Sequence, residues 1–176
     1  MKNKLILTSV LSVFALATAA SAQTGSGTLG VTATVAGSIN LTFSTDASGL
    51  AMTGTTTSTA SLPMGTVSMY SGTLPTNVTK TINGITSFSL STPFDVRVDL
   101  ANSASTAYTL NAQLQTSDIV NTWNIGAFPL VAATPVALTA AGAYATAVPY
   151  VLKITVPATA TAGTITNTIN FSAVGG

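Results

Sequence analysis

The side chains that could carry chemistry are few. The sequence contains no His, Cys or Glu, and its four acids are Asp46, Asp95, Asp99 and Asp118. Without His or Cys, a Ser-His-Asp or Cys-His nucleophile cannot form, and a zinc site lacks its usual ligands. We therefore expect no catalytic residue, no metal site and no cofactor-binding residue, and we expect that the protein is not an enzyme.

The spacing of the aspartates argues against a paired acid and base. Asp95 and Asp99 are four residues apart in an alternating stretch, which separates them by roughly 13 Å along a strand. We interpret them as a solvated strand face around Arg97. Asp46 and Asp118 lie in polar stretches, where an aspartate most often bonds nearby backbone in a turn. A calcium ion held together with backbone carbonyls is the alternative for these two.

The aromatic residues offer one candidate for ligand binding. Trp123, followed by Asn124, is the best single position for stacking against a carbohydrate ring. A lone Trp in an all-β protein is more often part of the core, because aromatic rings dominate core burial. The sequence leaves both interpretations open.

The elements that position these residues are predicted from hydrophobic alternation. It is clearest in residues 94–100 and 108–114, where apolar and polar residues alternate one by one. A period of two places alternate side chains on opposite faces of a strand. We predict two amphipathic strands here, joined by residues 101–107.

Weaker alternation predicts the remaining strands. They are residues 29–35, 39–43, a short strand within 65–71, 86–90 ending at Pro93, 123–128 ending at Pro129, 136–138, 144–156 and 164–174, with turns at 46–49, 74–77 and 140–142. No helix is expected after residue 22. Nine or ten short strands predict an all-β fold, an antiparallel β-sandwich of immunoglobulin-like or Greek-key type. A closed barrel is the alternative, and an outer-membrane barrel is disfavoured because paired aromatic girdles are missing.

The first 22 residues have the features of a cleaved export signal. Lys2 and Lys4 precede an apolar run that is shorter than the roughly 20 residues of a membrane span, and a small-x-small site ends at Ala22. We predict a signal peptide at 1–22 and one domain at 23–176, in which residues 23–36 are a possible donor strand. The mature chain is expected to pass through the periplasm, to be secreted to the cell surface or beyond, and to have no membrane span.

The charge balance excludes one class of partner. After cleavage, Lys80, Arg97 and Lys153 oppose the four aspartates, so the net charge is three minus four, or −1. A chain without a basic patch cannot neutralise phosphates, and we expect no binding to nucleic acid. Since the sequence lacks cysteine, stability must come from sheet packing and not from disulfides.

Both ends of the mature chain have strand patterns. Leu29, Val31, Ala33 and Val35 alternate with small polar residues, and a terminal strand of this kind can add to the exposed sheet edge of a neighbour. Such a contact repeats head to tail and builds a fibre. The expected partners are therefore copies of the chain itself or a related subunit.

Two stretches resemble a known group of proteins. Residues 27–43, Gly-Thr-Leu-Gly-Val-Thr-Ala-Thr-Val-Ala-Gly-Ser-Ile-Asn-Leu-Thr-Phe, and the turn and strand from Val156-Pro157 to Ala173 resemble secreted fimbrial and spore-coat-U-like β-sandwich domains. The resemblance implies an immunoglobulin-like pilin assembled by donor-strand addition, with a periplasmic chaperone as a further partner. The chain lacks the cysteine that those families usually carry near Ser38, and the C-terminal tyrosine of many pilins.

Two functional hypotheses follow from the sequence. The first is a structural subunit of a bacterial surface filament, pilus or extracellular matrix, with Leu29, Val31, Ala33 and Val35 as the donor face. The alternative is a monomeric extracellular module that binds carbohydrate or acts as a surface adhesin through Trp123 and loop residues.

Overall fold

The computed structural model describes residues 28–176, so the predicted signal peptide and residues 23–27 lie outside the described part. The chain divides into two units that meet between Thr34 and Val35. Residues 28–34 contain no strand, whereas the second unit contains every strand of the described chain.

The second unit is all-β and antiparallel, as predicted, and residues 28–176 contain no helix. Its strands are β1 (Ser38–Ser44), β2 (Thr66–Val67), β3 (Gly72–Thr73), β4 (Thr79–Asn83), β5 (Ser87–Ala101), β6 (Tyr108–Leu114), β7 (Thr122–Ile125), β8 (Phe128–Leu130), β9 (Val136–Gly142), β10 (Ala147–Pro157) and β11 (Ile169–Gly175). Over the same residues, no helix has the length and apolar character needed to cross a membrane.

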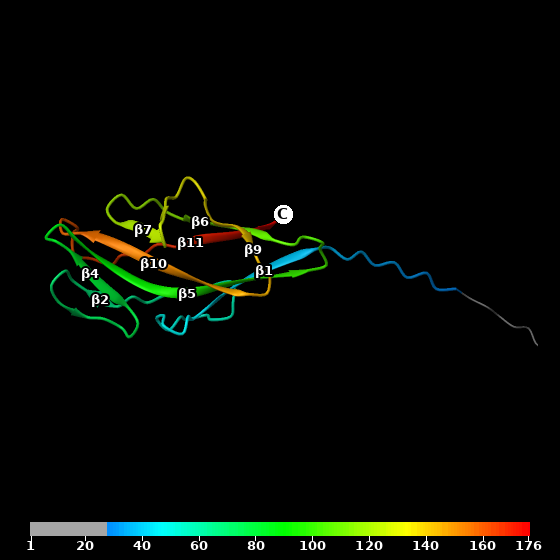
Figure 1. The fold of residues 1–176 in the computed structure, drawn as a ribbon, viewed down its shortest axis with the longest axis horizontal. Helices are drawn as coiled ribbons and strands as arrows, with labels where there is room; N and C mark the ends of the chain where they lie inside the picture. The colour runs from blue at the N-terminus through cyan, green and yellow to red at the C-terminus, as the bar shows by residue number, and fades with distance from the viewer. Residues whose placement is uncertain (1–27) are drawn as a thin grey trace, which may run out of the picture. The chain divides into compact units, whose positions relative to one another are not determined.

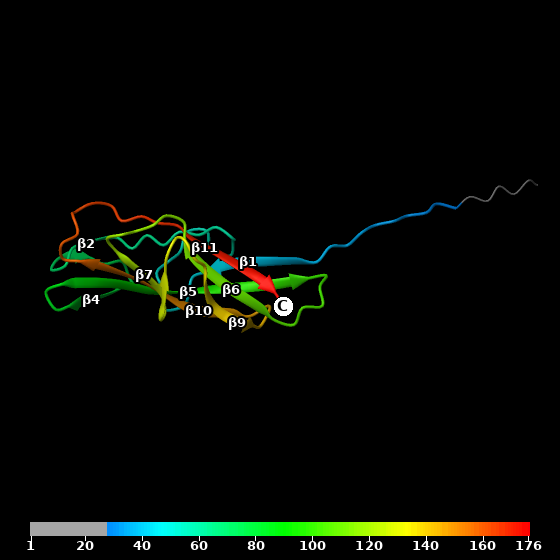
Figure 2. The same ribbon diagram turned by 90° about the horizontal axis from the view of Figure 1, so that it is seen from above.

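The strands form three sheets of unequal width (Figures 1 and 2). The largest has the order β1-β5-β10-β7-β8 and curls into a half-barrel, with β4 pairing on the same edge of β5 as β1. The second sheet has only the order β11-β6-β9, and β2 and β3 form a small hairpin. The six-stranded sheet therefore presents more inner surface than the three-stranded sheet provides.

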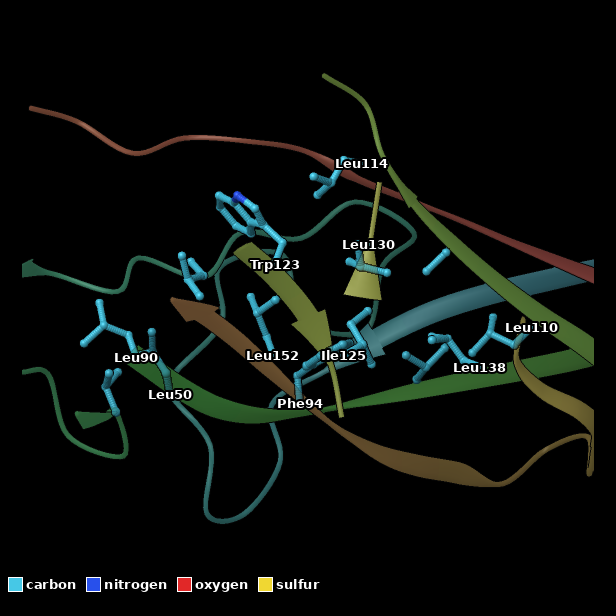
Figure 3. Close-up of a cluster of buried hydrophobic side chains, with 14 of the residues drawn as sticks. Leu50, Leu90, Phe94, Leu110, Leu114, Trp123, Ile125, Leu130, Leu138 and Leu152 are labelled. Atoms are coloured by element: carbon cyan, nitrogen blue, oxygen red, sulfur yellow. The ribbon is translucent and has the colours of Figure 1, made fainter. Parts of the chain in front are cut away.

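The core contains the inward faces of the two larger sheets. Val96 and Val98 from β5, Leu110 from β6 and Ile125 from β7 are completely buried. Figure 3 shows part of this cluster, with Phe94 and Leu152 projecting among the strands. The two strands with the clearest alternation are confirmed as β5 and β6, and they belong to different sheets.

The predicted break at Pro93 is wrong, because Pro93 lies inside β5, which is 15 residues long. On one edge of β5, pairing with β4 ends at Ser91 and pairing with β1 begins at Asp95. Pro93 lies in the gap between these two partners, where a missing backbone N–H removes no ladder hydrogen bond. Gly49 packs there so closely that an added Cβ would lie 2.2 Å from the Pro93 carbonyl oxygen.

Two other predicted breaks are also wrong. Pro129 lies inside β8, which forms a hairpin with β7, and residues 140–142 belong to β9 and not to a turn. Gly142 has a packing role, since an added Cβ would lie 2.3 Å from the Tyr108 ring. This contact is between β9 and β6, which are distant in sequence, so the local sequence pattern could not predict it.

The strands differ from the prediction in three further places. Residues 29–35 form no strand within the chain, and the last strand begins at Ile169 instead of residue 164. The edge strand β4 was not predicted. The Asn83-Gly84 pair after it is a hairpin signal that could have identified it.

Thr92 should be a sensitive position for stability. Its buried Oγ1 accepts a hydrogen bond from the Leu50 N–H at 2.8 Å and donates to the Asn77 carbonyl at 3.0 Å. Thr92→Val leaves both backbone groups unpaired, so we expect the free energy of unfolding to fall by roughly 2–4 kcal/mol. Urea unfolding measures this loss. Thr92→Ser keeps the hydroxyl and should retain most of the stability, and equal losses in both variants would contradict the hydrogen-bond explanation.

Candidate functional site

The main surface feature of the second unit is an apolar groove of about 1650 Å³. Its floor is the inner face of β5 and β10, from Phe88, Leu90 and Phe94 to Leu152, Ile154 and Val156, with Trp123 from β7. One wall is residues 58–70, and the other is residues 160–171, which lead into β11. The groove lies where the three-stranded sheet does not cover the wider sheet.

The lining of the groove indicates what it can hold. It contains three methionines, Met52, Met64 and Met69, and no Asp, Lys or Arg. Methionine is flexible and adapts its shape to an apolar partner. The volume exceeds the roughly 300–1000 Å³ of a small-molecule pocket. An uncharged, extended peptide segment therefore suits the groove better than a polar ligand or an ion.

The wall formed by residues 58–70 is held by polar contacts with the body. Thr53 and Ser61 form a bridge with two backbone hydrogen bonds of 3.0 and 2.9 Å. At the other end of the wall, the Lys80 ammonium donates to the Ser68 and Ser71 carbonyls at 3.2 and 3.3 Å. Lys80 thus fastens the β2–β3 hairpin to β4.

The opposite wall presents a free strand edge. The Gln115 N–H bonds the Thr168 carbonyl, and the Gly176 N–H bonds the Ala107 carbonyl, so the even-numbered residues of β11 face β6. Alternate residues of an antiparallel strand point their backbone groups to opposite sides. The N–H and C=O groups of Ile169 and Phe171 therefore face the groove side, where β11 pairs with no other strand of residues 28–176.

One end of the groove is closed by aromatic rings. Phe43 from β1 and Phe171 from β11 make an edge-to-face contact with ring centroids 5.0 Å apart. The ring centroid of Phe94 lies 6.1 Å from that of Phe171. The edge of β1 is covered at this point, because Phe43 exchanges backbone hydrogen bonds with Thr56 and Thr57. These rings and the covered edge of β1 mark the end of the groove at which Phe94 lies.

The predicted donor residues are all exposed. Leu29, Val31 and Val35 have exposed fractions of 89%, 82% and 70%, and Ala33 is exposed as well. We call residues 28–36 the arm. Every residue of the core lies beyond it, so the arm contributes no buried side chain to the described chain.

Trp123 is packed among the core side chains that form the groove floor, with only 5% of its area exposed. Its indole N–H donates to a carboxylate oxygen of Asp118 at 2.7 Å. A ring that stacks against a sugar needs an open face, and Trp123 presents little of one. The packing therefore favours the core interpretation of this residue over ligand stacking.

Asp118 is a turn residue that also anchors Trp123. Its carboxylate accepts hydrogen bonds from the backbone N–H groups of Val120 and Asn121 at 3.0 and 2.8 Å, and from the Asn121 side chain. Partial burial by itself would raise the pKa of Asp118, but together the bonds from Asn121, Trp123 and Val120 outweigh it and lower the pKa to about 2.

The other aspartates make local contacts, and two of them, Asp46 and Asp95, lie near each other. Arg97 bonds Asp99 at 2.8 Å on an exposed face, as predicted for a solvated strand surface. Asp46 accepts from the Ser48 N–H and hydroxyl within its turn. Burial, followed by the nearby Asp46 carboxylate, raises the pKa of Asp95. Within residues 28–176 no group of three or more His, Cys, Asp or Glu is placed to hold a metal ion.

No protein-family model matches the sequence, and comparisons with curated proteins and with solved structures find no significant similarity. The candidate site therefore rests on the geometry of the groove, the free edge of β11 and the arm.

Sequence reasoning identified the arm but missed the groove. Its walls are irregular segments, and residues 58–70 have no periodicity that marks them as lining residues. One available signal was the concentration of Met52, Met64 and Met69 in a stretch otherwise rich in Thr and Ser.

We expect Asp118→Asn to lower the free energy of unfolding at neutral pH by roughly 1–3 kcal/mol, because it removes the charge from a hydrogen-bonded acceptor. Since the folded pKa, about 2, lies below the ordinary 3.8, the carboxylate stabilises the fold above about pH 4 and loses that effect as the pH falls toward 2.

Thermal unfolding across this pH range tests both statements. The stability of the variant should change less with pH than that of the unchanged protein. Asp99→Asn, which alters an exposed ion pair, is the matched control. Identical pH profiles for the unchanged protein and Asp118→Asn would contradict the role given to this carboxylate.

Proposed function

We propose that the protein is a secreted structural subunit of a bacterial surface filament, pilus or matrix, and that subunits join by strand addition. The arm of one copy enters the apolar groove of the next, with Leu29, Val31, Ala33 and Val35 facing the floor. In this proposal the two larger sheets form an antiparallel β-sandwich of the immunoglobulin-like or Greek-key kind, which the entering strand completes. The subunit passes through the periplasm, where a chaperone is a further partner.

The observation that carries the proposal is the match between the arm and the groove. Residues 29–35 would span roughly 20 Å as an extended strand. The groove floor on β5, from Phe88 to Phe94, contains the same number of residues and therefore has a matching length. Both surfaces lack charge and alternate with a period of two. The free N–H and C=O groups of Ile169 and Phe171 provide ladder partners for the entering backbone.

The energies indicate how strong such a joint is. Full burial of Leu29, Val31 and Val35 contributes roughly 1.5–3 kcal/mol each, or about 5–9 kcal/mol together. Association costs an estimated 4–15 kcal/mol in lost freedom. Ladder hydrogen bonds add roughly 0.5–1.5 kcal/mol each. The arm therefore gives a reversible joint unless further contacts between the subunits add to it.

Deleting residues 23–36 after the signal should give a folded, exported protein that does not polymerise, because the arm contributes nothing to the core. Sedimentation and electron microscopy of the purified protein measure assembly. A synthetic peptide of residues 28–36 should bind the deleted protein. Normal fibres from the deleted protein, or a full-length chain that stays monomeric, would reject the proposal. A monomer that binds glycans would favour the alternative module.

The two faces of the arm should respond differently to charge. Val31→Asp buries an unpaired carboxylate in the groove at a cost of several kcal/mol, so the critical concentration for assembly should rise at least roughly a hundredfold. Thr32→Asp adds the same charge on the opposite face and should change it much less. Light scattering against concentration measures both. Equal effects would mean that the arm does not enter as a strand with one buried face.

A further inference from the structure

The end of the wide sheet where β5 begins and β10 ends brings several loops together. Ser87 pairs with Pro157, and Thr122 pairs with Thr155, so the β4–β5 turn, the loop after β10 and the loop before β7 share one end. Figures 1 and 2 both show the β4–β5 turn and the loop after β10 together at this end. We call it the end surface.

The end surface exposes apolar side chains without a structural reason in the single chain. Ile85, at the tip of the β4–β5 turn, is 82% exposed, and Ile119, in the loop before β7, is 95% exposed. Val120 beside it is half exposed. The strands that carry these two loops, β5 and β7, both pair with β10. Ile85 and Ile119 are therefore exposed apolar residues on two different loops at the same end of the sheet.

The groove leads to the same end. Its inner end is closed by the Phe43–Phe171 ring contact, whereas at the opposite end its lining includes the loop residues 160–163 after β10. An arm that fills the groove therefore enters past this loop. Only Ala36 and Gly37 separate the arm's last apolar residue, Val35, from the start of β1. Two residues span at most about 7 Å, so the body of the entering copy must lie against the end surface.

We propose that the end surface binds the body of a second copy of this chain; this inference rests on the proposed function. Ile85 and Ile119 pack against a hollow of about 680 Å³ on the second copy, beside the start of its β1. That hollow is lined by Ile39, Leu100 and the uncharged residues Ser103, Ala104 and Ser105, together with Gly37, Gly175 and Gly176. The contact supplies the stability that the arm alone does not provide, and it fixes the angle between neighbouring subunits.

The test uses the mature full-length chain carrying Ile85→Thr and Ile119→Thr together. Both positions are exposed loop positions, so the fold should be retained. We expect the critical concentration for assembly to rise roughly ten- to a hundredfold. Val151→Thr, an exposed apolar residue on the outer face of β10 away from the end surface, is the matched control and should leave it unchanged.

Peptide binding separates this inference from the proposed function. The same Ile85 and Ile119 substitutions in the arm-deleted protein should leave the affinity for the 28–36 peptide unchanged. An unchanged critical concentration, or an equal loss of peptide affinity, overturns the end-surface contact while leaving strand addition intact. If the peptide does not bind the arm-deleted protein that carries no substitution, the proposed function fails, and this inference fails with it.

Discussion

The unequal width of the two main sheets governs how the apolar core is covered. Six strands on one side present an apolar inner face, and three strands on the other cannot cover it. The part over Phe88, Leu90 and Ile154 is covered instead by irregular segments, and these three side chains are only 6–7% exposed. Because burial of apolar surface is the main favourable term in folding and association, the proposed entry of an apolar strand would be driven by contact with the groove lining.

The composition of the arm is what supports its proposed entry into this groove. Its apolar residues alternate, it has no charge, and it is not used in the core of its own chain. The protein has no cysteine, and residues 28–176 contain no helix and no cluster of metal-binding side chains. Its stability must therefore come from sheet packing. Completion of the gap by a neighbour would join assembly and stability in one step, and the proposed contact of Ile85 and Ile119 would add to it outside the groove.

The sequence predicts some parts of this architecture better than others. The alternation in β5 and β6 is strong because both strands have one buried and one solvated face, and local pattern identifies them. Pro93, Pro129 and Gly142 resemble strand breaks in the sequence, but the structure accommodates each inside a strand. Pro93 lies at a gap between β4 and β1, Pro129 lies in an edge hairpin, and Gly142 packs against the Tyr108 ring. The arm was recognised as strand-like, but only the structure shows that it is absent from its own sheets. The groove could not be predicted, because its walls lack periodicity.

The most direct measurement is amide hydrogen exchange of the arm-deleted protein with and without the 28–36 peptide. The account predicts that the Ile169 and Phe171 amides, which face the groove, exchange quickly alone and become protected by the peptide. The Asn170 and Ser172 amides already bond β6 and should be protected in both samples. Peptide binding that leaves Ile169 and Phe171 unprotected would contradict the claim that the missing strand pairs with β11.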